Sequence, residues 1–402
     1  MTFNNSGLSD VRRVLINSVF AKKGGALTYI QNVVSELQKS LGDNVELIVL
    51  RTKTEDAAKY EVPGVRYINN DEVSVQNAQA VSNPLKRIWH DQVTLPKMIK
   101  KEKIDVLFSA GNFGVLRCPC KQILLVRNTV FFDDLYLQRI QSWKIKLFYK
   151  FQRLLTVMSM RAADYVLFPS QSMYNLVAAQ IESKSKWKVA HYGSRPDLFY
   201  GKTNDKKEGD PIRLFHVGLY SDQKNLSTLF RGLQILDSRY KLKFKLELTA
   251  GFNQNWLGES AFFPNFKKEQ EMYFDLQSKG LAEDIDWLNY SALAERYRLC
   301  DIFLFPSYTE SFGHPLVEAM HSGLAIVASD TEINRELCGD AALYFSTFDA
   351  EDCALKIEQL SIDVQLKNNL IEKGRKRAAQ FTWGKHAKVL RDCVYDLCEI
   401  KK

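Results

Sequence analysis

The sequence predicts an α/β protein made of two doubly wound domains that face each other across a cleft. The chain has 402 residues, too many for one ordinary hydrophobic core, which indicates two domains of roughly 200 residues each. Short apolar strands alternate with helix-like stretches along the whole chain, a pattern typical of parallel sheets covered by helices. The polar segment 201–211 (GKTNDKKEGDP) lacks apolar anchors and divides this pattern into two halves.

The first half, residues 1–200, begins with a strand, a glycine turn and a helix. The strand is expected at 14–20, the turn at Gly24 and Gly25, and an apolar-periodic helix at 27–41. Alternating elements follow. We expect strands at 45–50, 105–109, 123–126, 165–168 and 188–191, and helices at 143–161 and after residue 170.

The same alternation restarts after the linker 201–211 and defines a second domain over residues 212–382. Strands are expected at 213–217, 245–249, 302–305 and 324–328, with a helix at 226–236 and another that opens at Pro315. Neither half contains a short-period repeat or a low-complexity tract.

Composition excludes several classes of protein. Hydrophobic residues make up 46% of the chain and aromatic residues 12%, as in a well-packed globular enzyme. No apolar run approaches the roughly 20 residues of a membrane span, and the first residues lack an apolar signal core, so we expect a cytoplasmic protein. The seven cysteines are odd in number and lack zinc-ligand spacing, so no metal site is expected.

Charge is divided unevenly between the two halves. Residues 1–200 hold 28 Lys and Arg against 17 Asp and Glu, a net charge of +11, while the remainder carries −3. The basic half should face an anionic partner, and charge alone leaves nucleic acid, a diphosphate and an acidic membrane open. Helix 143–161 (WKIKLFYKFQRLLTVMSMR) alternates cations with apolar residues, which suits either a membrane surface or a solvated helix over a core.

Segment 301–330 (DIFLFPSYTESFGHPLVEAMHSGLAIVASD) is the most informative candidate site. A strand runs into a polar turn and then a helix opened by Pro315, and the free N–H groups at such a helix start attract anions. Glu310 in the turn and Glu318 in the helix can point at the crevice beyond the strands. Glu318 lies among core-type residues, so it needs a specific polar partner such as a ribose diol, although a dipole-complementing acid is the simpler alternative.

A second candidate is FHVGLYSDQKNL, residues 215–226. Gly218 lets the backbone approach a ligand closely, and Lys224 offers a mobile positive charge for a diphosphate. Taken alone, Lys224 also fits a surface lysine in a turn, and Gly24 and Gly25 fit a simple structural turn.

These motifs together resemble family 4 of the retaining glycosyltransferases, which share the GT-B fold. Glu310-Ser311-Phe312-Gly313 followed by Glu318-Ala319-Met320 resembles the family's Glu-x7-Glu signature. Further similar segments cover most of the chain: the glycine pair, Ala163-Asp164 to Ser170, Lys188 to Phe199, Lys224-Asn225 and Phe381-Thr382-Trp383. The resemblance implies two Rossmann-like domains, with 1–200 binding the acceptor, 212–382 binding a nucleotide sugar, and the last helix, 383–402, packing back on the first domain.

The resemblance also implies site roles. Glu310 would contact donor-sugar hydroxyls, Glu318 the ribose, and Lys224 the departing diphosphate, with no cofactor and no divalent metal. The remaining donor-binding positions would be Gly24, Gly25, Gly218, Asn128, Tyr290, Ser311, Phe312, Gly313, Leu316 and Val317.

Two positions depart from the family pattern. Leu219 stands where an Arg is common, and Arg127-Asn128 stands where a His-Asp pair is common. We therefore expect Arg127 to face the cleft as a catalytic cation that replaces part of the missing charge, with a plain surface arginine as the alternative.

The expected function is transfer of a hexose-type sugar to a saccharide or lipid-linked saccharide in polysaccharide or glycolipid synthesis, with loose attachment to anionic membranes. The alternatives are a nucleotide-sugar epimerase or a phosphorylase of the same fold, a non-catalytic subunit, and a nucleic-acid-binding protein. The chain has no helix-turn-helix, zinc-finger or RNA-binding aromatic signature, so no nucleic-acid partner is expected.

Overall fold

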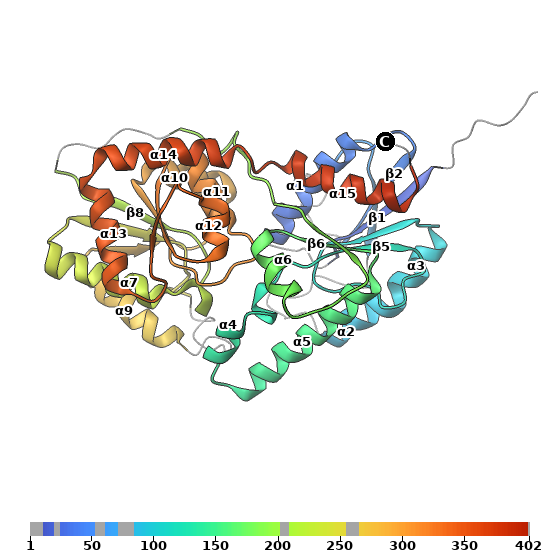
Figure 1. The fold of residues 1–402 in the computed structure, drawn as a ribbon, viewed down its shortest axis with the longest axis horizontal. Coiled ribbons are helices and arrows are strands. Elements are labelled where there is room, and N and C mark those ends of the chain that lie inside the picture. The colour runs from blue at the N-terminus through green and yellow to red at the C-terminus, as the bar shows by residue number, and fades with distance from the viewer. Residues whose placement is uncertain are drawn as a thin grey trace, which may run out of the picture.

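The computed structural model describes residues 11–19, 25–52, 61–70, 84–201, 209–254 and 265–400. These residues form two lobes side by side, each built around one parallel sheet with helices on both faces (Figure 1). Every strand pair is parallel, so the carboxyl ends of the strands in each sheet lie at one edge.

The first sheet has seven strands in the order β3-β2-β1-β4-β5-β6-β7 and forms the centre of what we call the N-terminal domain. Strand order reverses direction beside β1, which creates a crevice at the carboxyl ends of β1 and β4. The strands are β1 (Arg12–Asn17), β2 (Val45–Thr52), β3 (Arg66–Asn70), β4 (Val106–Ser109), β5 (Lys121–Leu125), β6 (Tyr165–Phe168) and β7 (Lys186–Val189).

The second sheet has six strands in the order β10-β9-β8-β11-β12-β13 and forms the centre of the C-terminal domain. Its strand order reverses between β8 and β11, which places a second crevice at the ends of these two strands. The strands are β8 (Ile212–His216), β9 (Phe244–Leu248), β10 (Ala282–Asp284), β11 (Ile302–Phe305), β12 (Ala325–Ser329) and β13 (Leu343–Phe345).

Helices cover both sheets. Those that precede β8 are α1 (Gly25–Ser40), α2 (Pro84–Trp89), η2 (His90–Thr94), α3 (Leu95–Lys101), η3 (Thr129–Phe131), α4 (Asp134–Arg139), α5 (Trp143–Ala162) and α6 (Gln171–Ala178). Those that follow β8 are η4 (Asp222–Lys224), α7 (Leu226–Ile235), η5 (Leu236–Tyr240), α9 (Phe266–Ser278), α10 (Tyr290–Leu299), α11 (His314–His321), α12 (Glu332–Cys338), α13 (Ala350–Ile362), α14 (Val364–Ala378) and α15 (Trp383–Leu397). Within the described ranges, no helix is long and apolar enough to pass through a bilayer.

The central strands read as continuous apolar runs because both of their faces are covered. β4, β6 and β11 are buried at every residue, and this burial is the main source of stability for each sheet. The strands at the sheet edges have a weaker sequence signal. β3 is mostly half-buried, and β10 and β13 have only three residues each, so periodicity did not predict these three strands.

The last helix, α15, crosses back to the N-terminal domain and lies beside α1, as the resemblance implied (Figure 1). His386 of α15 is buried and hydrogen-bonded on both sides of its ring: Nδ1 lies 3.0 Å from the Ala190 carbonyl oxygen and 3.2 Å from that of His191, and Nε2 lies 2.7 Å from the Tyr29 hydroxyl. Because a carbonyl oxygen only accepts, Nδ1 carries the proton and Nε2 accepts from Tyr29. Burial lowers the pKa of His386 to about 4, so the ring stays neutral at pH 7.

The two domains also meet through polar contacts around the start of α6. Ser170 Oγ donates to the Ser311 carbonyl oxygen at 2.7 Å. Glu336 of α12 accepts from the backbone N–H groups of Gln171 and Ser172, each at 2.7 Å, and contacts His191 Nε2 at 2.7 Å. A carboxylate of one domain thus satisfies free N–H groups at a helix start of the other, which fixes the angle at which the domains meet.

Replacing Gly193 by alanine should destabilise this crossover. A Cβ at Gly193 would lie 2.1 Å from the Trp383 backbone nitrogen, so the start of α15 would have to move away from the N-terminal domain. We expect a loss of about 1–3 kcal/mol of stability, measured by urea unfolding. The matched control is Gly384→Ala, where the new Cβ meets only Glu36 at 3.5 Å and helix propensity rises. Equal stability of the two variants would contradict the account.

Candidate active site

Lys224 lies in a turn at the carboxyl end of β8, as expected. Gly218 follows this strand with φ of +152°, and a Cβ at Gly218 would lie 3.0 Å from Lys224 Cε. The glycine therefore provides the space in which the lysine side chain lies. Leu219 is 47% exposed, and its apolar side chain supplies no cation at the position where a family arginine was expected.

Lys224 Nζ donates to Glu310 Oε1 at 2.6 Å, although the two residues are 86 positions apart in the sequence. Their side chains are only 14% and 16% exposed, so the attraction is weakly screened by water. The ion pair joins the turn after β8 to the turn after β11, and thus spans the crevice at the point where strand order reverses.

Asn225 holds the lysine turn in place. Its backbone is left-handed, with φ of +53°, and its buried amide donates to the carbonyl oxygens of Pro306 at 3.2 Å and Thr347 at 2.6 Å. Asn tolerates this conformation better than most residues. Lys224 is therefore positioned by hydrogen bonds that need no bound ligand.

Glu318 is almost fully buried in α11, next to two tyrosines of α10. Oε1 accepts from the Tyr290 hydroxyl at 2.9 Å and Oε2 from the Tyr297 hydroxyl at 3.1 Å. Burial raises the pKa of Glu318 to about 7, and the two tyrosine hydrogen bonds partly oppose that rise. The specific polar partner expected for this acid is thus provided within the protein, by the two tyrosine hydroxyls.

The start of α11 forms the base of the crevice between Glu310 and Glu318. Gly313 precedes the helix with φ of +94°, a left-handed conformation that favours glycine, and Pro315 lies in the first turn. Phe312, Leu316 and Val317 are buried. The N–H of Leu316 already donates to the Gly313 carbonyl oxygen at 3.0 Å, and the Ser311 carbonyl is used by Ser170.

Arg127 and Asn128 follow β5 on the N-terminal side of the cleft. The backbone N–H groups of both residues donate to Asn112 Oδ1, at 2.8 and 3.1 Å. The Asn128 side chain caps η3 by accepting from Val130 N at 3.2 Å, a structural task that sequence reasoning did not foresee. The Arg127 guanidinium lies 5.7 Å from the Tyr29 ring centre. The pKa of the His314 imidazole, at the start of α11, is low mainly because the ring is buried, and the positive charge of Arg127 lowers it further.

A hollow of about 470 Å³ opens between the two domains. Glu310, Tyr308 and Thr309 line it from the C-terminal domain, and α6 lines it from the other side. This volume falls in the range of roughly 300–1,000 Å³ typical of small-molecule sites. The cleft predicted from two facing domains is therefore present, and an acid of the central motif lies on its wall.

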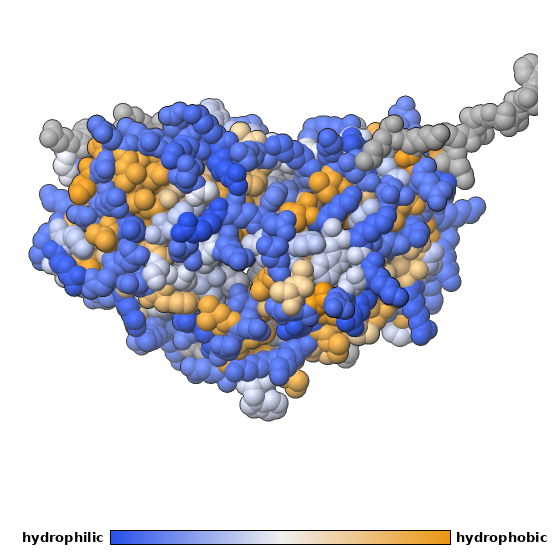
Figure 2. Space-filling model, in the orientation of Figure 1, coloured by the Kyte–Doolittle hydropathy of each residue, from blue (hydrophilic) through white to orange (hydrophobic). Residues whose placement is uncertain are grey.

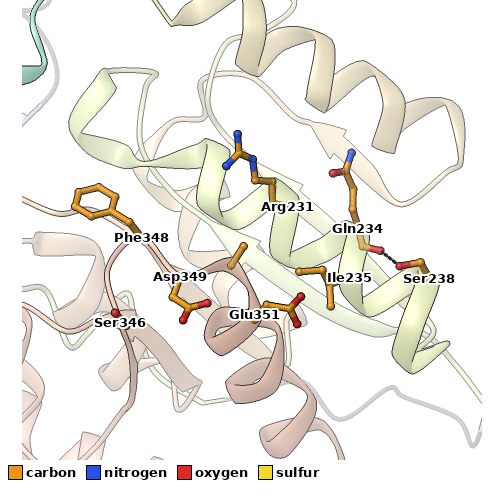
Figure 3. Close-up of a pocket in the computed structure, with 9 residues that line it drawn as sticks. Arg231, Gln234, Ile235, Ser238, Ser346, Phe348, Asp349 and Glu351 are labelled. Atoms are coloured by element: carbon orange, nitrogen blue, oxygen red, sulfur yellow. Dashed lines mark hydrogen bonds between the residues drawn. The ribbon is translucent and has the colours of Figure 1, made fainter.

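Another surface hollow, of about 700 Å³, lies within the C-terminal domain between α7 and the start of α13 (Figure 3). Arg231 and Gln234 extend away from Asp349 and Glu351 in this view, so the polar groups do not converge on one point. None of the predicted site residues lines this hollow, whereas Glu310 lines the hollow between the domains, which is therefore the stronger candidate of the two.

Two family models together match most of the chain: "Glycosyltransferase Family 4" over residues 23–197 and "Glycosyl transferases group 1" over residues 202–377. The chain belongs to glycosyltransferase family 4. The glycosyltransferase relatives described next agree with this assignment.

Sulfoquinovosyl transferase SQD2 of Arabidopsis thaliana is 23% identical over 94% of this chain and 72% of its own length. O-antigen chain mannosyltransferase B of Escherichia coli is 26% identical over 42% of each chain, so the alignment spans less than half of that relative.

Solved structures share the whole fold. Sucrose-phosphate synthase from Thermosynechococcus elongatus superposes with a TM-score of 0.72 at 17% identity, over 97% of this chain and all of that one. WaaG, a glycosyltransferase involved in lipopolysaccharide biosynthesis, gives a TM-score of 0.69 at 12% identity over 95% and 99% of the two chains. HepE from Anabaena, solved with UDP and glucose, gives 0.68 at 14% identity over 96% and 100%. This glycosyltransferase therefore has the GT-B fold.

The structure brings together Lys224 with Glu310 and Tyr290 with Glu318, and it places Arg127 on the opposite domain. Gly25 is the first residue of α1, and Gly24 lies outside the described residues. Sequence reasoning missed Tyr297 and Glu336. Both lie in helices that the sequence did not predict, α10 and α12, and their partners described above are 21 or more positions away in the sequence.

The buried carboxyl of Glu318 should make stability fall as pH rises. Its pKa is about 7 in the folded chain against an ordinary 4.5, so the folded chain keeps a proton that the unfolded chain has lost in this window. Stability should fall by about 3 kcal/mol between pH 4.5 and 8 because of this group. When stability is measured by urea unfolding across this pH range, Glu318→Gln should lack this part of the decrease. Glu271→Gln, which replaces an exposed acid of α9, should show the same decrease as wild type. Parallel pH profiles for wild type and Glu318→Gln would contradict the account.

Proposed function

We propose that this glycosyltransferase transfers a hexose-type sugar, with retention of anomeric configuration, from a nucleotide-diphosphate donor to a saccharide or lipid-linked saccharide. The observation that carries the proposal is the part-buried ion pair of Lys224 and Glu310 at the carboxyl ends of β8 and β11, with Glu318 buried in the helix that follows. A cation and two acids in different environments match the diphosphate, the sugar hydroxyls and the ribose of such a donor.

In the proposed reaction each member of the ion pair neutralises the other until the donor binds. Lys224 then turns its ammonium to the diphosphate and stabilises the charge that develops as the bond to the sugar breaks. Glu310 is released to accept hydrogen bonds from sugar hydroxyls, and Glu318 accepts from the ribose. Because the lysine supplies positive charge at the leaving group, we expect turnover without a divalent metal, which activity in EDTA would test.

The relatives support the donor and acceptor classes. HepE was solved with UDP-glucose, and the curated relatives are named as mannosyl- and sulfoquinovosyl transferases, among others. Several of these names refer to O-antigen or capsular polysaccharide. We therefore propose a role for this chain in polysaccharide or glycolipid synthesis.

Replacing Lys224 by methionine should lower kcat/KM about 100-fold or more, because the diphosphate loses its cation. The donor is first found by thermal shift with UDP, GDP, ADP and dTDP sugars, since a donor at 100 times its Kd adds about 2.7 kcal/mol of apparent stability. The matched control is Lys245→Met, which breaks an equally short but exposed pair with Glu283.

Arg127→Ala should also lower kcat/KM, and an unchanged value would remove Arg127 from the site.

The same assay separates the alternatives. An epimerase would convert the donor with no acceptor present, a phosphorylase would require phosphate, and a non-catalytic subunit would bind nucleotide without turnover. Equal activity of Lys224→Met and Lys245→Met would contradict the proposed function.

We further propose that α5 rests on an anionic membrane surface. Ile145, Thr156, Ser159 and Met160 face the domain, while Trp143, Leu147, Phe151, Leu154 and Met158 form an exposed stripe at helical spacing. The helix carries five cations and no acid. It runs along the lower edge of the molecule (Figure 1), where the surface is a mixture of orange, pale and blue atoms (Figure 2). An exposed apolar stripe with basic flanks is typical of helices that lie in a membrane interface.

The full chain should sediment with anionic vesicles at low salt, and binding should weaken at high salt as the charges are screened. Changing Trp143, Leu147 and Phe151 together to serine should abolish binding with little loss of stability, because all three are exposed. Trp287→Ser, which removes an equally exposed tryptophan of the other domain, should bind normally. Equal binding to neutral and anionic vesicles would contradict the proposal.

A further inference from the structure

A second polar pocket lies at the crevice of the N-terminal sheet. Asn17 ends β1, Ser109 ends the neighbouring strand β4, and Arg127 follows β5, the next strand along. Asn17 and Ser109 are direct partners in the β1–β4 pairing. Together with Arg87 of α2 and the loop 110–113, these residues enclose a pocket of about 170 Å³.

The charged side chains that line this pocket are Arg87, Arg127 and Asp91. Asp91 is buried and already has partners, with Arg87 Nε at 3.7 Å and His90 Nδ1 at 3.1 Å. Within the described parts of the chain, Arg127 makes no ion pair. The pocket lining therefore carries one more positive than negative charge. The arginine without an acidic partner is Arg127, which follows a strand that ends at the crevice.

The neutral groups of the pocket also offer hydrogen-bond donors. The Ser109 side chain is 2% exposed, and its Oγ has no partner among the described residues. A buried hydroxyl without a partner is costly and uncommon. The Oδ1 of Asn112 is used by two backbone N–H groups, which leaves its amide NH₂ to the pocket. A Cβ at Gly111 would lie 3.6 Å from Arg87 Nη2, so this guanidinium borders the loop that closes the pocket.

We propose that this pocket is an acceptor subsite that binds one anionic group, a phosphate or a carboxylate, carried by the acceptor saccharide or its lipid anchor. The pocket offers hydrogen-bond donors from two guanidinium groups, one hydroxyl and one amide. Such a set of donors matches an oxyanion better than a cluster of neutral hydroxyl groups. The volume is below the roughly 300–1,000 Å³ of a whole-ligand site, so it suits a single group. Lys224, Glu310 and Glu318 all belong to the other domain, so Arg127 is the one residue lining this pocket that was also expected to act at the donor.

The assignment to the acceptor rests on the proposed function, whereas anion binding itself does not. The test is isothermal titration of the full chain with three probes: glucose 6-phosphate, glucuronate and neutral methyl glucoside. We expect at least one anionic probe to bind about tenfold or more tightly than methyl glucoside. Tighter binding of glucose 6-phosphate indicates a phosphate-bearing acceptor, and tighter binding of glucuronate indicates an acidic sugar.

Ser109→Ala removes one hydroxyl and should weaken the anionic probe about tenfold. Ser278→Ala in α9, an exposed serine that lines neither this pocket nor the hollow between the domains, is the matched control and should bind the probe as wild type does. Arg87→Lys retains the charge opposite Asp91 but loses the planar fork, and should also weaken the probe. Probe affinity should be the same with and without a saturating nucleoside diphosphate.

Equal affinity for the anionic and neutral probes, an unchanged affinity in Ser109→Ala, or displacement of the probe by the nucleotide would overturn the inference. These results are independent of the donor screen. If the chain binds the anion through Ser109 but binds no nucleotide, the proposed function is contradicted and the anion site is not. If the chain binds a nucleotide but not the anion, only the anion site is contradicted.

Discussion

The ion pair between Lys224 and Glu310 is the contact on which the arrangement of the C-terminal crevice depends. It connects the turns after β8 and β11 at a position where water screens little of the attraction. Removing either partner would leave the other charge unpaired and largely shielded from water, which costs more than the loss of an exposed pair. Asn225 fixes the backbone of the lysine turn independently, so donor binding needs to move only the Lys224 side chain. Such preorganisation is what electrostatic stabilisation of a leaving group requires.

The two acids of the Glu-x7-Glu motif lie in contrasting environments. Glu310 faces a cation at the edge of the cleft between the domains, whereas Glu318 is buried against Tyr290 and Tyr297, and its pKa rises to about 7. Although they are only eight positions apart, Glu310 is paired with a positive charge and Glu318 is hydrogen-bonded to neutral hydroxyl groups. Arg127 lines a separate pocket of the N-terminal domain, and Asp133 is the charged residue that this domain contributes to the hollow facing Glu310.

Most of the fold could be predicted from sequence, because buried parallel strands are continuous apolar runs. The expected limits of β6 and β11 agree with the structure, and those of the other predicted strands differ by a few residues. The short edge strands carry too little apolar signal. In the site, the sequence identified the residues of the motif and the lysine turn. It could not identify Tyr297 or Glu336, because their partners are brought close only by tertiary packing. It could not identify Ser109 either, because only the packed structure shows that its buried hydroxyl has no partner among the described residues.

The central claim is that Lys224, Glu310 and Glu318 hold one nucleotide sugar. The most direct measurement is a crystal structure of the chain with the nucleotide sugar that stabilises it most. The account predicts a ribose at Glu318, a diphosphate at the Lys224 ammonium, and a Lys224–Glu310 separation longer than the 2.6 Å of the unliganded pair. A nucleotide bound elsewhere, with that ion pair intact, would contradict it.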